Sequence, residues 1–214
     1  MEGYALSQER FAARRGPSRM LRIASDERLV ALTRAGNQGA FEVIVDRYQP
    51  RLLSFCTRIV GSREDAEDVL QEVFAASFNA LLGDAREINL RPWLYRIARN
   101  RSLNHLRRRT AIGVDSMDVH FAEMGLSTSE KVFKREDFKL LVGDIGQLPE
   151  TQRTALLLRE IDGMSYEQIA LAMDQTVPGI KSLLVRARVG LGEASEARKL
   201  SCEDVRVELG SVAE

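Results

Sequence analysis

Apolar residues recur every three or four positions along most of this chain, and that spacing constrains the fold more than any other feature of the sequence. It is the period of an α-helix that buries one face. The pattern is clear over residues 52–60 and again over 66–82, where Phe74, Phe78 and Leu82 are expected on the buried face. No segment alternates strongly between apolar and polar residues, as a half-buried strand does. The sequence therefore predicts an all-α fold.

Glycine, serine and proline mark where the first of these helices begin and end. Gly61 closes one helical run, and Ser62 is the expected N-cap of the next, which has acids in its first turn. Pro92 suits the first turn of a third helix over residues 93–109. These signals predict three consecutive helices in the first half of the chain.

A second helical block has the outline of a helix-turn-helix. Pro149 begins one helix and Gly163 follows its end. Ser165, with Gln168 three residues later, matches the capping box of another helix. A short turn then leads to a helix with basic residues and no acid, which is the arrangement expected of a DNA-reading pair.

An acidic stretch separates the two blocks. From residue 111 to 130 the chain has four acids, no lysine or arginine, and no clear periodicity, which indicates a flexible linker. The predicted architecture is two small helical domains joined by this linker. Five parts are expected: a basic N-terminal extension (1–25), a first helical domain (26–110), the linker (111–130), a helix-turn-helix domain (131–194) and a C-terminal tail (195–214).

Charge is balanced over the whole chain but strongly segregated along it. The sequence has 31 basic and 31 acidic residues, yet residues 86–110 hold eight arginines and one acid. The preceding helix presents Glu64, Asp68, Gln71 and Glu72 on one face, spaced by three and four residues. Such segregation indicates a polyanion at one surface and a different, basic partner at another.

The sequence offers little for catalysis, cofactors, metals or membranes. His105 and His120 are its only histidines, and it has no glycine-rich phosphate loop and no metal-spaced Cys/His group. Cys56 and Cys202 are too few for a disulfide framework, which favours a reducing compartment. No apolar run approaches the roughly 20 residues of a membrane span. We expect a cytoplasmic protein that is not an enzyme.

Composition alone leaves two interpretations of the arginine-rich helix. Its arginines and asparagines can neutralise phosphates and bond to base edges, or they can form a solvated basic face. Trp93 and Tyr95 can likewise stack on bases or pack in the core; for Trp93, its neighbour Leu94 favours the core.

Six motifs in one order are more specific than any of these features separately. They are D-A-E-D-V-L-Q-E-V-F (65–74), W-L-Y-R-I-A-R-N (93–100), L-R-R-R (106–109), L-P-E-T-Q-R (148–153), G-M-S-Y-E-Q-I-A (163–170) and K-S-L-L-V-R-A-R (181–188). Over roughly residues 26–194 the chain resembles the bacterial sigma factors of the extracytoplasmic-function (ECF) group. The resemblance implies an alternative sigma factor that binds core RNA polymerase, recognises the −10 and −35 promoter elements and aids promoter melting.

The resemblance also implies partners and site residues. The partners are core RNA polymerase, through its clamp and flap regions, promoter DNA, and an anti-sigma factor. The polymerase contacts would be Asp68, Gln71 and Glu72. The −10 contacts would be Arg86 and Asn89, in a loop (83–91) that captures a flipped base, and Arg96, Arg99, Asn100, Asn104 and Arg107 on the helix that follows. The −35 contacts would be Lys181, Ser182, Arg186 and Arg188.

The second domain departs from the family pattern in three places. Met173-Asp174 stands where Leu-Gly is usual, and Asp tolerates the left-handed conformation of such a turn less well than Gly. Pro178-Gly179 removes the usual threonine, so we expect the following helix to lose its hydroxyl cap, at a cost of about 1 kcal/mol. Leu183 replaces an arginine that could reach DNA.

Some alternatives stay open at this point. The linker either threads toward the RNA path of the polymerase or is a simple tether. The tail resembles the start of a zinc-binding anti-sigma domain, but Cys202 alone cannot hold zinc. A helix-turn-helix repressor or activator that acts without polymerase would not need the acidic face. A helical interaction protein would not need the arginine-rich helix.

Overall fold

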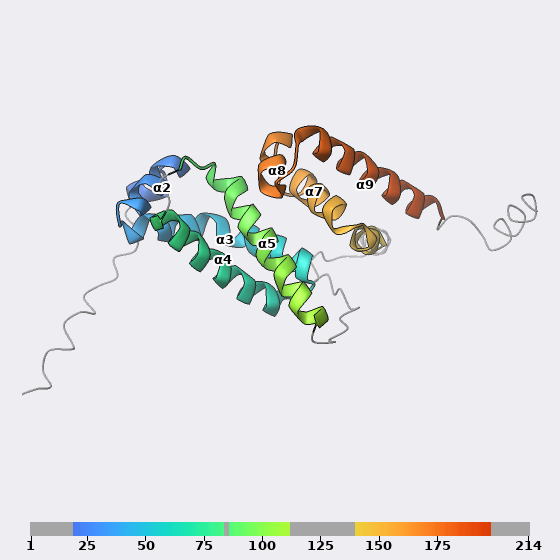
Figure 1. Ribbon diagram of the computed structural model, residues 1–214, viewed down its shortest axis with the longest axis horizontal. Coiled ribbons are helices and arrows are strands. Elements are labelled where there is room, and N and C mark those ends of the chain that lie inside the picture. Colours follow the sequence, from blue (N-terminus) through green and yellow to red (C-terminus); the bar gives the residue numbers. More distant parts are fainter. Residues whose placement is uncertain (1–18, 84–85, 112–139, 198–214) are drawn as a thin grey trace, which may run out of the picture.

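The structure is a computed structural model that describes residues 19–83, 86–111 and 140–197 (Figure 1). These residues form α-helices and turns and contain no strand, which confirms the predicted all-α fold with two helical units. The linker and most of the N-terminal extension and the C-terminal tail lie outside the described residues. Those parts, and the domain boundaries, stay predictions.

The first unit contains the helices that precede the acidic segment. They are α1 (Arg19–Arg22), α2 (Asp26–Arg34), α3 (Gln38–Val60), α4 (Arg63–Gly83) and α5 (Leu90–Ala111). Gly61 ends α3 in the left-handed conformation, at φ 82°. The Ser62 hydroxyl accepts a hydrogen bond from the Asp65 N–H at 3.3 Å and so caps α4. Both predicted boundaries are confirmed.

Helices α2 to α5 pack around one core, whose fully buried side chains include Leu29, Ile44, Phe55 and Leu94. This arrangement fixes α4 and α5 side by side, because both pack against α3 and against each other. Their outer faces, acidic on α4 and basic on α5, therefore lie on one rigid body.

One predicted core position on α4 is wrong. Leu81 is buried, whereas Leu82 is 50% exposed. Successive residues of an α-helix lie about 100° apart, so only one of the two can face α3. Phe74 and Phe78 are half-buried and pack with Phe41, at ring-centroid distances of 6.5 and 4.9 Å.

The second unit begins with a helical segment over residues 140–147 and continues with α7 (Glu150–Glu160), α8 (Tyr166–Met173) and α9 (Val177–Ala197). The predicted capping box of α8 is confirmed. The Ser165 hydroxyl accepts from the Gln168 N–H at 3.2 Å, and the Gln168 side chain accepts from the Ser165 N–H at 3.1 Å. Gly163, just beyond α7, has φ 62°, as a residue that terminates a helix often does.

The turn between α8 and α9 confirms one expectation and corrects another. Asp174 takes the left-handed conformation, with φ 54° and ψ 51°. The expected loss of a hydroxyl cap is wrong, because the Thr176 hydroxyl accepts a hydrogen bond from the Gly179 N–H at 3.2 Å. Thr176 immediately precedes α9, so the cap comes from the residue before Val177 and the helix start stays stabilised.

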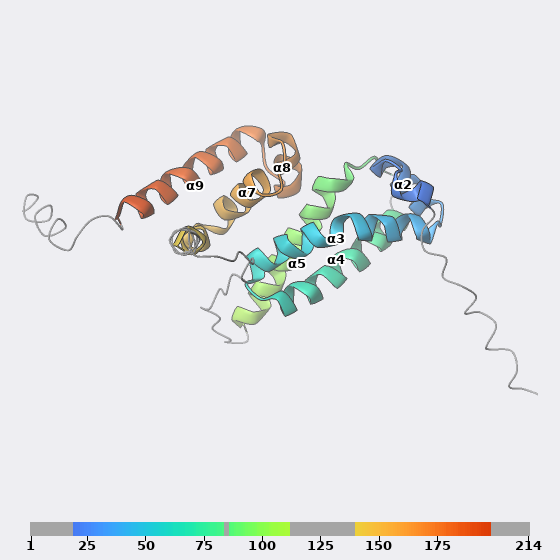
Figure 2. The same cartoon turned by 180° about the vertical axis from the view of Figure 1, so that it is seen from behind.

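The two units touch through α8, which packs against α5. Figures 1 and 2, seen from opposite sides, both place α7 and α8 beside α5, with α9 on the outer side of the second unit. The basic helix of the first unit and the helix-turn-helix are therefore neighbours in this arrangement.

Candidate nucleic-acid and protein interfaces

A polar stripe runs along the exposed side of α5. Arg96, Asn100, Asn104 and Arg107 are all exposed and follow one another at intervals of four, four and three residues. This spacing places them on one helical face, with an arginine at each end and two amides between them. The opposite face of α5 carries buried residues such as Leu94 and is fixed in the core. The stripe can contact phosphates with its ends and base edges with its amides.

Two further predicted −10 contacts lie just before α5. Arg86 and Asn89 are both exposed. The Arg34 side chain donates a hydrogen bond to the Arg86 carbonyl at 2.5 Å, which ties this segment to α2. These two side chains are thus presented near the N-terminal end of the polar stripe.

Arg99 is placed differently from the other predicted −10 contacts. It forms a bidentate ion pair with Glu150 of α7: Nε lies 3.1 Å from Oε1 and Nη2 lies 2.9 Å from Oε2. The two side chains are only 15% and 29% exposed. In this arrangement the guanidinium is occupied by the second unit.

Other arginines of α5 hold α4 in place, a role that sequence reasoning missed. Arg109 donates to Asp65, and the His105 imidazole lies 3.4 Å from the same carboxylate. Arg101 pairs with Glu72 at 3.2 Å. The pairs join residues 29 to 44 positions apart, so no local spacing rule reveals them. Part of the positive charge on α5 is therefore structural.

The acidic face of α4 is exposed as a group. Asp68, Gln71 and Glu72 all face solvent, as does Glu64. Glu72 is about half-exposed and shares its charge with Arg101. An exposed pair of this kind contributes at most about 1 kcal/mol.

Tyr95 belongs to the core and not to a base-stacking surface. It is fully buried, and its ring packs against Phe55 at a centroid distance of 5.1 Å. Its hydroxyl donates a hydrogen bond to Asp162 of the second unit. Trp93 is half-buried against the same core. For these two aromatics, packing is the role that the structure shows.

The outer face of α9 presents all four predicted −35 contacts. Lys181, Ser182 and Arg186 are exposed. Arg188 is also exposed and pairs with Glu160 at 2.7 Å. Leu183 is half-buried and packs against the core, so it does not lie on this outer face.

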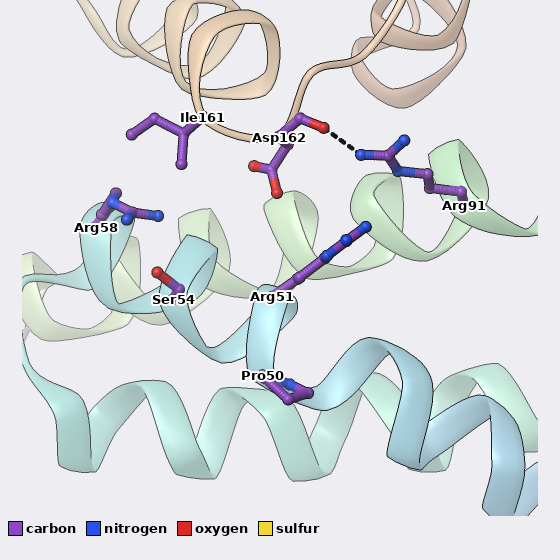
Figure 3. A pocket seen from close by; sticks show the side chains of 7 residues that line it. All are labelled: Pro50, Arg51, Ser54, Arg58, Arg91, Ile161 and Asp162. Atoms are coloured by element: carbon purple, nitrogen blue, oxygen red, sulfur yellow. Dashed lines mark hydrogen bonds between the residues drawn. The ribbon is translucent and has the colours of Figure 1, made fainter.

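Asp162 sits where the two units meet and was not identified from the sequence. The Arg91 side chain donates to its backbone carbonyl, while Tyr95 donates to its carboxylate. Figure 3 shows Arg51, Arg58 and Arg91 around it, lining a cavity of about 460 Å³. Burial raises the pKa of Asp162, and the tyrosine hydrogen bond and the three arginines oppose that shift.

The described residues hold no group of three or more histidine, cysteine, aspartate or glutamate side chains arranged to bind a metal ion. Among the same residues, no helix has the length and apolar character needed to cross a membrane.

Comparison with known proteins identifies the family. The family model for sigma-70 region 2 matches residues 44–112, and that for sigma-70 region 4 matches residues 145–191. The chain is 36% identical over 185 residues to the RNA polymerase sigma-H factor of Pseudomonas aeruginosa, covering 82% of this chain and 96% of the relative. This chain belongs to the ECF sigma factors of the sigma-70 family. It is also 37% identical over 174 residues to the ECF RNA polymerase sigma-E factor of Escherichia coli, covering 77% of this chain and 91% of that factor.

Solved structures agree with this family. The sigma factor RpoE of Bartonella quintana, in complex with the anti-sigma factor NepR, aligns with a TM-score of 0.58 and 26% identity over 73% of this chain and 96% of that chain. CnrH, in complex with the cytosolic domain of CnrY, shares the fold with a TM-score of 0.61 and 24% identity, over 80% of this chain and 97% of that chain. The protein is an alternative sigma factor, a DNA-binding regulator. The repressor and interaction-protein alternatives are set aside.

Proposed function

We propose that this sigma factor uses opposite charges on α4 and α5 for two partners. The acidic face of α4 binds core RNA polymerase, the polar stripe of α5 binds the −10 element, and α9 binds the −35 element. The observation that carries the proposal is the placement of these charges on adjacent helices of one rigid body. Polymerase and DNA can then be held side by side.

The α5 stripe has the chemistry for a DNA strand that is being separated. Arg96 and Arg107 stand at the ends of the stripe and supply charge for phosphates, which makes binding salt-dependent. Asn100 and Asn104 lie between them and can bond to base edges. Arg86 and Asn89 lie beside the stripe, where a base flipped out of the stack can be captured. Arg99 joins this surface when it is released from Glu150.

For the −35 element, α9 reads the major groove with its outer face. Lys181, Ser182 and Arg186 are exposed along the first half of the helix, as in a helix-turn-helix reader. Arg188 adds a phosphate contact once it leaves Glu160. Leu183 packs inward, so this face has fewer charges than the family pattern supplies, and specificity depends more on the remaining three cations.

On the protein side, Asp68, Gln71 and Glu72 form a compact acidic patch on α4 that fits a basic surface of the polymerase clamp. The flap is the expected contact of the second unit. An anti-sigma factor is a further partner, and the complex of the related RpoE with NepR supports this assignment. We place the protein in the cytoplasm, where it acts without catalytic activity of its own.

Transcription with purified core polymerase tests the proposal. Core supplemented with this protein should start at specific promoters of a genomic library, and core alone should not. The double variant Asp68→Lys/Glu72→Lys should lose core binding, while Glu193→Lys, an exposed acid of α9, keeps it. Circular dichroism checks that the variants fold. Normal capture of core by the double variant would show that α4 is not the docking surface.

A further inference from the structure

The basic helix α5 already has an occupant, which is the second unit of the same chain. Arg99 donates two hydrogen bonds to the Glu150 carboxylate, at 3.1 and 2.9 Å. A carboxylate that bonds two guanidinium N–H groups makes the same contact that a phosphate would make. Glu150 therefore competes directly with DNA for Arg99.

A second contact secures the same arrangement about one helical turn earlier on α5. Tyr95 donates to the Asp162 carboxylate, and Arg91 donates to the Asp162 carbonyl. Arg51 and Arg58 of the neighbouring α3 face the same carboxylate across the cavity of Figure 3. Arg91, Tyr95 and Arg99 lie at intervals of four residues, so one face of α5 holds the second unit.

This arrangement is incompatible with binding to both promoter elements at once. The positions that give the −35 and −10 elements their names are about 25 base pairs apart, which corresponds to about 85 Å of duplex. Here α8 packs directly on α5. The 28 residues from 112 to 139 can span at most about 100 Å, which is enough for the units to separate. The chain must therefore open when it binds a promoter.

We propose that the contact between α5 and the second unit is a closed form of the free sigma factor, in which Glu150 and Asp162 hold the units together and cover Arg99. This inference rests on the proposed −10 function of α5. Because α9 lies on the outer side of the second unit, its Lys181 and Arg186 stay exposed in the closed form. In the closed protein the −35-binding residues of α9 stay exposed, and part of the −10-binding surface is covered until the units separate.

Closure can be measured without DNA or polymerase. Spin or fluorescent labels are attached to the full chain through Ala80→Cys on α4 and Gly192→Cys on α9, with Cys202→Ser; both label sites are exposed, and a side chain at Gly192 meets nothing within 4 Å. The label distance should be short in the otherwise unchanged protein. Glu150→Lys should lengthen it, and adding Arg99→Glu should restore it, because the pair is then reversed.

Glu193→Lys is the matched control for this measurement. It makes the same charge change on an exposed position of the second unit and should leave the label distance unchanged. A long distance in the parent protein overturns the closed form. So does a short distance that Glu150→Lys leaves unchanged, or a double variant that stays open.

The effect of closure on DNA binding is measured by the affinity for a −10 single strand and, separately, for a −35 duplex. The Glu150→Ala/Asp162→Ala variant should bind the −10 strand about tenfold more tightly than the parent, because apparent affinity falls with the closed fraction. Both proteins should bind the −35 duplex equally. If the double variant opens but gains no affinity for the −10 strand, occlusion of the −10 surface is refuted. If Arg99→Ala also leaves −10 binding unchanged, the proposed role of Arg99 fails as well.

Discussion

Removal of a single hydroxyl at Tyr95 should loosen the second unit from the first. Tyr95 is fully buried and donates to the Asp162 carboxylate across the contact between the units. Tyr95→Phe keeps the ring packed on Phe55, 5.1 Å away, and removes only the donor. The Asp162 carboxylate then loses its hydrogen bond from Tyr95 but stays in the contact. The change therefore isolates one interaction that exists only when the units touch.

The size of the expected shift toward the open form follows from the type of hydrogen bond that is lost. A hydrogen bond to a charged group contributes about 1.5–3 kcal/mol. At about 1.4 kcal/mol per factor of ten, the equilibrium between closed and open forms should shift by about tenfold or more toward the open form. Label distances in the full chain report this shift directly, and urea unfolding of the same samples reports the stability of the first unit.

A matched substitution separates this effect from a general loss of stability. Tyr48 is also buried and donates to Asp26, but both residues belong to the first unit. Tyr48→Phe should lower the free energy of unfolding of the first unit without changing the distance between the units. If Tyr95→Phe, like Tyr48→Phe, leaves the label distance between the units as it is in the parent protein, the Asp162 contact does not hold the units together.

Three further outcomes are expected from single substitutions. Thr176→Ala removes the cap of α9 and should lower the free energy of unfolding of the second unit by about 1 kcal/mol in urea titrations, and no loss would disprove the cap. Arg96→Ala should reduce the slope of log affinity against log salt for a −10 single strand by about 0.7, and an unchanged slope would remove Arg96 from the phosphate contacts. Asp162→Asn removes the charge but keeps an oxygen that can accept from Tyr95, so the contact between the units should remain. This variant should unfold at higher urea than the parent at pH 7, and the difference should vanish at low pH, where the aspartate of the parent is protonated. Burial raises the pKa of Asp162, despite the tyrosine and three arginines that face it, so its stabilising contribution is present when it is protonated and is lost as pH rises through that raised pKa. If the parent instead unfolds at higher urea than Asp162→Asn at pH 7, the charged form of Asp162 stabilises the protein and this prediction is wrong.

Local signals in the sequence predicted the helices well. Gly61, Ser62 and the capping box at Ser165 act over three or four residues, so their partners are visible in the sequence itself. The cap of α9 was missed for a local reason. The family pattern has a threonine at the position of Pro178-Gly179, whereas in this chain Thr176, two residues before Pro178, supplies the hydroxyl.

The contacts of the charged residues were harder to predict. The helical face of Arg99 predicts an exposed DNA contact. In the structure Arg99 pairs with Glu150, which lies 51 positions away in the sequence. Asp162 carries no motif of its own, and it gains a role only when Tyr95, 67 positions earlier, is brought beside it. Such pairs depend on tertiary distance and not on spacing along the chain.

Site-specific photocrosslinking within an initiation complex tests the central claim most directly. A photoreactive residue replaces Asn100 on α5 in one sample and Gln71 on α4 in another, since both positions are exposed and neither supports the core. Position 100 should crosslink to promoter DNA at the −10 element, and position 71 should crosslink to a polymerase subunit. Crosslinking of position 100 to protein alone, or of position 71 to DNA, would contradict the assignment of these two surfaces.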